Sequence, residues 1–201
     1  MMVKTAILCV PAYDEAAVDV VRRLLTDHMS VAMLFDRAAP MQRNLLEETL
    51  CRWADEDELD LIVTVGGTLP APGPGGRELV PDATLAVAER LLPGLAEATR
   101  ALAQEAAPLA ILDRSVAAIR GRTLILNLPA GAGAAALFLG SVVDVLPTVV
   151  ALLQDAQPDL HIVEDDEVTA TPESPSSAPP SAGGKQPLDP AEFAAFLARK
   201  Q

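Results

Sequence analysis

Aromatic side chains, cysteines and basic residues are all scarce in this chain of 201 residues. Aromatic residues make up only 3% of it, so its core must be built from Leu, Val, Ile and Ala. The formal net charge is −13 and no basic cluster interrupts it, which argues against nucleic acid or an anionic membrane as a partner. Half of the residues are apolar, enough for one domain with a sizeable core plus an appendage.

The two cysteines, Cys9 and Cys51, lie among apolar neighbours without metal-ligand spacing, and we expect both to be reduced core thiols. The N-terminus lacks the layout of a signal peptide, because it turns acidic before an apolar stretch accumulates. One uncharged run, 123–143, has the length of a membrane span. Its Asn127, Pro129 and glycines predict a strand, a loop and a helix instead. We therefore expect a cytoplasmic protein.

Composition divides the chain into a folded domain, 1–154, and a tail. Residues 155–187 are acidic and rich in Pro, Ser and Ala, a composition that cannot bury enough apolar surface to fold, so we expect them to be disordered. Residues 188–201 predict a short amphipathic helix with Phe193 and Phe196 on one face. That segment either docks on its own domain or binds a partner protein, and the sequence leaves both open.

Within the expected domain, the hydrophobic period alternates between that of a strand and that of a helix. A turn, Arg120-Gly121-Arg122, predicts a hairpin between the last two strands. The expected strands are 5–10, 31–35, 60–65, 115–119 and 123–128, and the expected helices are 14–28, 42–54, 81–104 with a bend near Pro93, and 132–154 with an interruption at Pro147. This order predicts an α/β fold, a three-layer α/β/α sandwich around a mostly parallel mixed sheet.

Two glycine-rich loops follow strands of this predicted sheet. One is Gly66-Gly67-Thr68, after the strand 60–65, and the other runs from Asn127 to Gly133. Ligands of open α/β sheets bind beyond the carboxyl ends of strands, where backbone N–H groups can hold a phosphate. A pair of glycines also makes an ordinary tight turn, and Asn127 is either a turn residue or a hydrogen-bonding ligand group.

Few other side chains point to chemistry. Glu78 precedes a predicted helix, where it either complements the helix N-terminus or ligates Mg²⁺. His28 and His161 have no catalytic neighbour in sequence, and no Ser/His/Asp or Cys/His constellation can be defended. Spacing alone therefore predicts a phosphate-binding α/β domain and nothing more specific.

The runs GGT…RELVPDATLAVAERLLPG and AILDRSVAAIRGRTLILNLPAG resemble the molybdopterin-binding family of MoaB and MogA type. That family reads TGGTG…RDVTPEAT…PG and then LSR…VRG…LIVNLPGSP. The resemblance is strong over 58–153, fair over 1–57 and absent from the tail. It implies the three-layer fold, commonly as a homotrimer, with molybdopterin as ligand.

The resemblance also implies a reaction, the adenylylation of the terminal phosphate of molybdopterin by Mg-ATP. ATP and Mg²⁺ are then the implied cofactors, with Glu78 as the catalytic, metal-linked acid. The residues implied to bind substrate or phosphate are Gly66, Gly67, Thr68, Asp82, Asn127, Leu128, Pro129 and Gly131.

Several positions depart from the family pattern. Val80 replaces a threonine, Leu69 a glycine, and Met41 a second acid, whose place on Mg²⁺ a thioether cannot take. The acidic motif expected after the first strand is also missing, so a replacement carboxylate would have to come from Asp14, Glu15 or Asp36. Three alternatives stay open: an adenylyltransferase, a non-catalytic pterin- or nucleotide-binding carrier or scaffold, and a relative that has exchanged its ligand.

Overall fold

The structure is a computed structural model that describes residues 2–70, 73 and 78–156. The predicted C-terminal segment 188–201, and the predicted tail except for its first two residues, lie outside the described residues.

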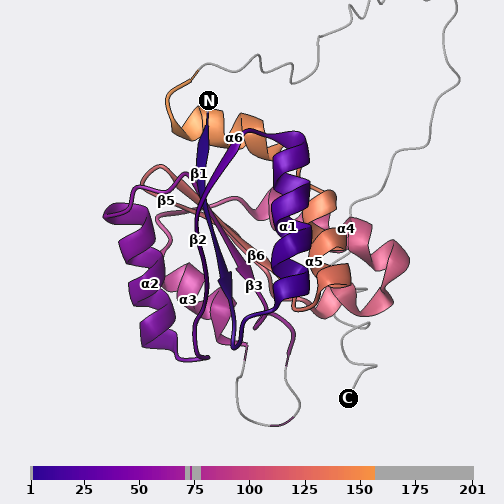
Figure 1. The fold of residues 1–201 in the computed structure, drawn as a ribbon. Helices are drawn as coiled ribbons and strands as arrows, with labels where there is room; N and C mark the ends of the chain where they lie inside the picture. The colour runs from indigo at the N-terminus through magenta and orange to yellow at the C-terminus, as the bar shows by residue number, and fades with distance from the viewer. Residues whose placement is uncertain (1, 71–72, 74–77, 157–201) are drawn as a thin grey trace, which may run out of the picture. The chain divides into compact units, whose positions relative to one another are not determined.

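A single six-stranded sheet, in the order β2-β1-β3-β6-β5-β4, forms the middle layer (Figure 1). β1, β2, β3 and β6 are parallel, whereas β5 runs antiparallel to both β6 and β4. The strands are β1 Val3–Cys9, β2 Val31–Ala38, β3 Leu61–Val65, β4 Arg90–Leu91, β5 Ala117–Arg120 and β6 Thr123–Leu128. The sheet is mostly parallel and mixed, as the sequence predicts.

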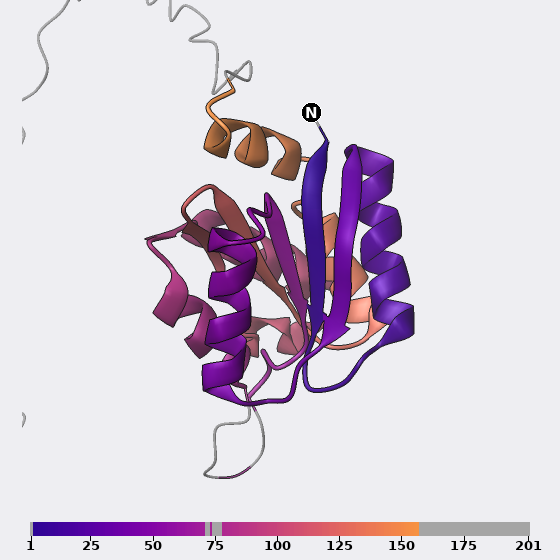
Figure 2. The same cartoon turned by 60° about the vertical axis from the view of Figure 1, so that its left-hand side comes forward.

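Helices cover both faces of this sheet, with α2 and α3 on one face and α1, α4 and α5 on the other (Figures 1 and 2). The helices are α1 Glu15–His28, α2 Arg43–Asp55, α3 Leu79–Val87, α4 Pro93–Ala106, α5 Ala132–Gly140 and α6 Leu146–Leu153, with a 3₁₀ turn at Pro108–Leu112. The predicted three-layer sandwich is therefore confirmed.

Apolar residues predominate in the central strands β3 and β6 because both of their faces are buried. Successive side chains of a strand point to opposite faces, so Ile62 packs in the core beneath α2 and α3, while Val63 packs in the core beneath α1 and α5. Each fully buried side chain of this kind contributes about 1.5–3 kcal/mol to folding. Trp53, the single tryptophan, is fully buried and stacks on Phe35 at the α2 face.

The prediction of a single helix over 81–104 is wrong, because the structure has α3, the short strand β4 and α4 in this region. α3 ends at Val87, and the backbone N–H groups of Glu89 and Leu92 donate to β5 carbonyls at 2.9 Å each. Pro93 then begins α4, since a proline without N–H is tolerated only in the first turn of a helix.

Other boundaries differ by less, and the strand predicted at 31–35 extends to Ala38. The predicted helix 132–154 breaks after Gly140, and Pro147 lies in the first turn of α6 rather than at the interruption. The strand predicted at 115–119 is β5, from Ala117 to Arg120. The predicted hairpin is confirmed, and Gly121 turns it with φ +55°.

The run 123–143 forms β6, a loop and α5, as predicted. Among the described residues, no helix is both long and apolar enough to cross a membrane. Cys9 is buried and Cys51 is only half-buried, and both are free thiols.

Candidate functional site

Three loops meet where the parallel strands β1, β3 and β6 end. β1 leads to α1 and back to β2 on one side, whereas β3 continues on the other side, so the strand order reverses between β1 and β3. Such a reversal opens a crevice that ligands of α/β sheets occupy. A cavity of about 430 Å³ lies there, lined by Val10, Pro11, Ala12, Tyr13, Asp14, Glu15, Val65 and Ala130.

Gly66 and Gly67 are glycines because the backbone and its neighbours leave no room for a side chain. Gly66 has φ +98°, and a Cβ there would lie 2.1 Å from the carbonyl oxygen of Val10. Its N–H donates to the carbonyl of Leu128 at 2.9 Å, so Gly66 joins the end of β3 to the end of β6. A Cβ on Gly67 would lie 2.7 Å from Met41 Cε, which places Met41 against this turn.

Thr68 anchors the segment that precedes β5. Its buried hydroxyl donates to Asp113 Oδ2 at 2.5 Å. The other oxygen of Asp113 accepts from the backbone N–H and the hydroxyl of Ser115. The backbone N–H of Arg114 donates to the carbonyl of Thr68 at 3.1 Å. The 113–115 segment is therefore held beside the loop that follows β3.

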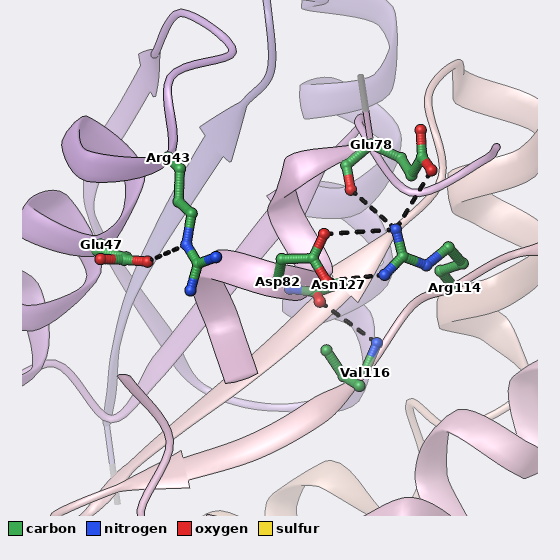
Figure 3. A network of polar contacts seen from close by, with 7 residues as sticks. All are labelled: Arg43, Glu47, Glu78, Asp82, Arg114, Val116 and Asn127. Carbon is green, nitrogen blue, oxygen red and sulfur yellow. Dashed lines mark hydrogen bonds and ion pairs between the residues drawn. The ribbon is translucent and has the colours of Figure 1, made fainter. Parts of the chain in front are cut away.

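Asn127 lies at the centre of a buried cluster, of which Figure 3 shows the contact with Val116. Its Nδ2 donates to the hydroxyls of Thr64 at 2.9 Å and Thr84 at 3.0 Å. Its Oδ1 accepts from the backbone N–H of Val116 at 3.3 Å. One amide thus ties β6 to β3, to α3 and to the segment before β5, and its predicted role as a ligand group stays a prediction.

Arg114 brings Glu78 and Asp82 together at the mouth of these loops (Figure 3). Its Nη2 lies 2.7 Å from Asp82 Oδ1, and its Nη1 lies 3.3 Å from Glu78 Oε1 and 3.4 Å from Asp82 Oδ2. The hydrogen bond to Asp82 raises the pKa of Arg114 further above its ordinary value, at which a guanidinium is already fully charged. Its side chain is 38% exposed, which leaves this cation within reach of a ligand.

The other predicted site residues are spread along the same edge. Glu78 is the N-cap residue of α3 and Asp82 lies in its first turn, where both complement the helix dipole. Leu128 is buried and Gly131, with φ +88°, caps α5. Pro129 lines a second, apolar cavity of about 290 Å³ next to α5. The structure therefore brings the predicted residues to one edge, although several of their polar groups bond internally.

The carboxylates of Glu78 and Asp82 do not fit a resident Mg²⁺ in this arrangement. Mg²⁺ requires oxygen ligands in near-octahedral geometry. Both oxygens of Asp82 and one oxygen of Glu78 already bond to Arg114. Across residues 2–70, 73 and 78–156, no group of three His, Cys, Asp or Glu side chains could hold a metal ion. The metal role of Glu78 stays a prediction.

Sequence reasoning did not single out Arg114, Asp113 or Ser115 as site residues. The signal that could have found them is the run LDRS, which stands in the second of the two motifs and ends just before a strand. Burying an acidic, a basic and a hydroxyl side chain in succession at a sheet edge costs free energy unless each has a hydrogen-bond partner, so such a run indicates partners nearby. Ser115 bonds to Asp113 nearby, whereas the partners Thr68 of Asp113 and Asp82 of Arg114 are more than thirty positions away.

Comparison with known proteins gives a consistent result. Residues 12–148 match a family described as "Probable molybdopterin binding domain". The molybdopterin adenylyltransferase of Escherichia coli (strain K12) is 40% identical over 118 residues, which are 58% of this chain and 58% of that protein. The chain therefore spans little more than half the length of this curated relative.

Solved structures agree with the sequence match. The molybdopterin biosynthesis enzyme MoaB from Thermus thermophilus has a TM-score of 0.70 at 34% identity, over 78% of this chain and 98% of that one. The molybdopterin biosynthesis Mog protein from Mycobacterium ulcerans has a TM-score of 0.64 at 27% identity, over 76% of this chain and 99% of that one. From the loop after β1 to the first turn of α6, the fold and the sequence agree, and the chain belongs to the molybdopterin-binding domain family of MoaB and MogA type.

Proposed function

We propose that this protein binds molybdopterin in molybdenum cofactor biosynthesis and transfers an adenylyl group from ATP to its terminal phosphate. The observation that carries the proposal is the half-exposed guanidinium of Arg114 beside the glycine loop at the carboxyl edge of the sheet. The matched family and the 40% identical adenylyltransferase support the choice of ligand and reaction.

The proposed reaction forms one phosphoanhydride bond and breaks another. An oxygen of the terminal phosphate attacks the α-phosphorus of ATP, and pyrophosphate leaves. Positioning and charge neutralisation are what a protein supplies to such a step. The chain would supply them through Arg114 and through the backbone of the Gly66–Thr68 and Leu128–Gly131 loops.

The cavity of about 430 Å³ between β1 and β3 has the size of a small-molecule site, which is roughly 300–1,000 Å³. Micromolar affinity requires about 8 kcal/mol, whereas one hydrogen bond to a charged group contributes about 1.5–3 kcal/mol. Apolar contact in the cavity must therefore accompany the phosphate contacts.

The proposal extends to features outside this site. We include Mg-ATP as the nucleotide, a homotrimer as the assembly and the cytoplasm as the location. We also retain the division into a domain at 1–154, a disordered tail at 155–187 and a helix at 188–201 that engages a partner protein or its own domain.

A non-catalytic molybdopterin carrier or scaffold is the second candidate. Met41 lies against Gly67 where the family has an acid, and Glu78 and Asp82 are occupied by Arg114. These contacts favour binding without chemistry, because they leave only Asp14 and Glu15 of the cavity lining to replace the carboxylates that the reaction implies.

The test is to incubate the protein with molybdopterin and Mg-ATP and to follow adenylylated molybdopterin and pyrophosphate by mass spectrometry. An adenylyltransferase forms both products in equal amounts above the rate without protein. A sample that retains molybdopterin but forms neither product supports the carrier. A sample that does not bind molybdopterin contradicts both functions.

A further inference from the structure

We infer that Arg114, and not a protein-held Mg²⁺ ion, is the cation that binds the terminal phosphate of molybdopterin at this site. The inference rests on the proposed function, because it assumes that molybdopterin is the ligand. It differs from that function by assigning Glu78 to the arginine instead of to a metal, and Asp82 to the arginine instead of to the substrate.

The two ends of the guanidinium are held unequally (Figure 3). Nη2 has one short contact, 2.7 Å to Asp82 Oδ1. Nη1 has three long contacts, 3.3 Å to Glu78 Oε1, 3.3 Å to the Glu78 carbonyl and 3.4 Å to Asp82 Oδ2. Distances of this length are weak hydrogen bonds. Asp82 therefore anchors the arginine, while Nη1 can exchange its weak contacts for a phosphate oxygen.

The backbone around Arg114 holds this residue beside the Gly66–Thr68 loop. Its N–H donates to the carbonyl of Thr68, and the flanking Asp113 and Ser115 are buried and bonded to each other. The side chain thus extends from a backbone that is fixed against Thr68, the residue after Gly67. A planar guanidinium matches the oxygens of a phosphate and binds them with charge-assisted hydrogen bonds.

A metal at the same place would meet two obstacles. It would have to displace Arg114 from both carboxylates or lie close to its positive charge, which repels it. In addition, the side chain at position 41, where the family has a second acid, is a methionine, and its thioether is a poor ligand for Mg²⁺.

The two arrangements predict opposite effects for Glu78→Gln. If Glu78 holds a metal that binds the phosphate, the change weakens binding. If Arg114 binds the phosphate, the change removes a negative charge that competes for Nη1, and binding tightens about threefold. Arg114→Gln is expected to weaken binding about tenfold or more, as the loss of a charge-assisted contact does.

The experiment measures the affinity of the full chain for molybdopterin and for its dephosphorylated form by isothermal titration calorimetry. Each titration is run anaerobically, once in excess EDTA and once in excess Mg²⁺. The variants are Arg114→Gln, Arg114→Lys and Glu78→Gln. Arg122→Gln is the matched control, because it removes an exposed, ion-paired arginine at the amino-terminal edge of the sheet. A separate titration with ATP in EDTA shows whether nucleotide phosphates use the same arginine.

If the inference holds, the affinity for molybdopterin is the same in EDTA and in Mg²⁺. Arg114→Gln lowers the affinity for molybdopterin but not for its dephosphorylated form. Arg114→Lys recovers part of the lost affinity. Binding that requires Mg²⁺ and weakens in Glu78→Gln overturns the inference and leaves the proposed function standing. No affinity for molybdopterin under either condition overturns both. If Arg114→Gln loses affinity for ATP but not for molybdopterin, Arg114 binds the nucleotide, which also overturns the inference. Circular dichroism of each variant separates lost binding from lost folding.

Discussion

Helix α3 contributes to two polar clusters that differ in burial and in charge. Thr84 belongs to the neutral cluster around Asn127, whose side chains are almost completely buried. Asp82, two positions earlier, belongs to the charged cluster around Arg114, which is about one-third exposed. The two clusters share one helix and one edge of the sheet.

The difference in burial assigns stability to the Asn127 cluster and ligand binding to the Arg114 cluster. A buried polar group must have its hydrogen bonds made within the protein, because water cannot replace them, so the Asn127 cluster stabilises the join between β3, β6 and α3. A half-exposed ion pair contributes little to stability, because water screens it. The Arg114 cluster can therefore rearrange around a ligand at small cost to the fold.

The largest expected effect is that of Asn127→Ala on stability. It removes three internal hydrogen bonds and leaves the Thr64 and Thr84 hydroxyls without this partner, which should lower the free energy of unfolding by about 3 kcal/mol. Urea denaturation followed by circular dichroism measures it. A loss of molybdopterin affinity with unchanged stability would instead show that Asn127 is a ligand group.

A smaller loss is expected for Thr68→Val, which keeps the shape of the side chain but removes its hydrogen bond to the buried Asp113. We expect a loss of about 2 kcal/mol, because the acceptor is a buried carboxyl group. Thr26→Val is the matched control, since its hydroxyl bonds to a carbonyl on the exposed face of α1. Equal denaturation midpoints for the two variants would contradict the structural role of Thr68.

Arg114→Gln should change stability by less than about 1 kcal/mol, because its ion pairs are partly exposed. The same variant is expected to lose affinity for molybdopterin, as described above. Thermal unfolding and calorimetry of one sample give both values. If Arg114→Gln destabilises the fold as strongly as Asn127→Ala, the distinction between the two clusters fails.

The smallest effect concerns Arg120 and Asp55, an ion pair away from the candidate site. The hydrogen bond from Arg120 lowers the pKa of Asp55 below its ordinary value. The unfolded chain then binds this proton at higher pH than the folded chain does, so the stabilisation is present above the ordinary pKa and is lost as the pH falls through the lowered one. Arg120→Gln should therefore lose stability at neutral pH and show a shallower acid-induced decline below about pH 4. Urea midpoints across this range measure it, and parallel curves for the variant and the parent would contradict the ion pair.

The sequence predicted much of the fold because its signals are local. The flat apolar runs located β1, β3 and β6, and Asp14 marked the start of α1, where its side chain accepts from the Ala17 N–H. The prediction of one helix over 81–104 was wrong because the interruption of the helix depends on pairing with a distant strand. Residues 89–92 pair with β5, and no local periodicity reports that pairing.

The sequence likewise predicted the local features of the candidate site but not its long-range contacts. The glycine loops were found from sequence because a glycine pair after a strand is visible without a structure. The partner of each polar side chain was not visible, since Thr68 meets Asp113 and Arg114 meets Asp82 across long separations in the chain.

By itself, the amino-acid sequence determined the order of the strands apart from β4, the family, and the candidate edge of the sheet where the glycine loops lie, because periodicity and motif are properties of neighbouring residues. Only the tertiary structure decided that Asn127 is enclosed by hydroxyls and that an arginine lies between Glu78 and Asp82. Those pairings arise when packing of the two cores sets the register of the strands and brings α3 against the segment before β5, and packing acts between residues that are remote in sequence.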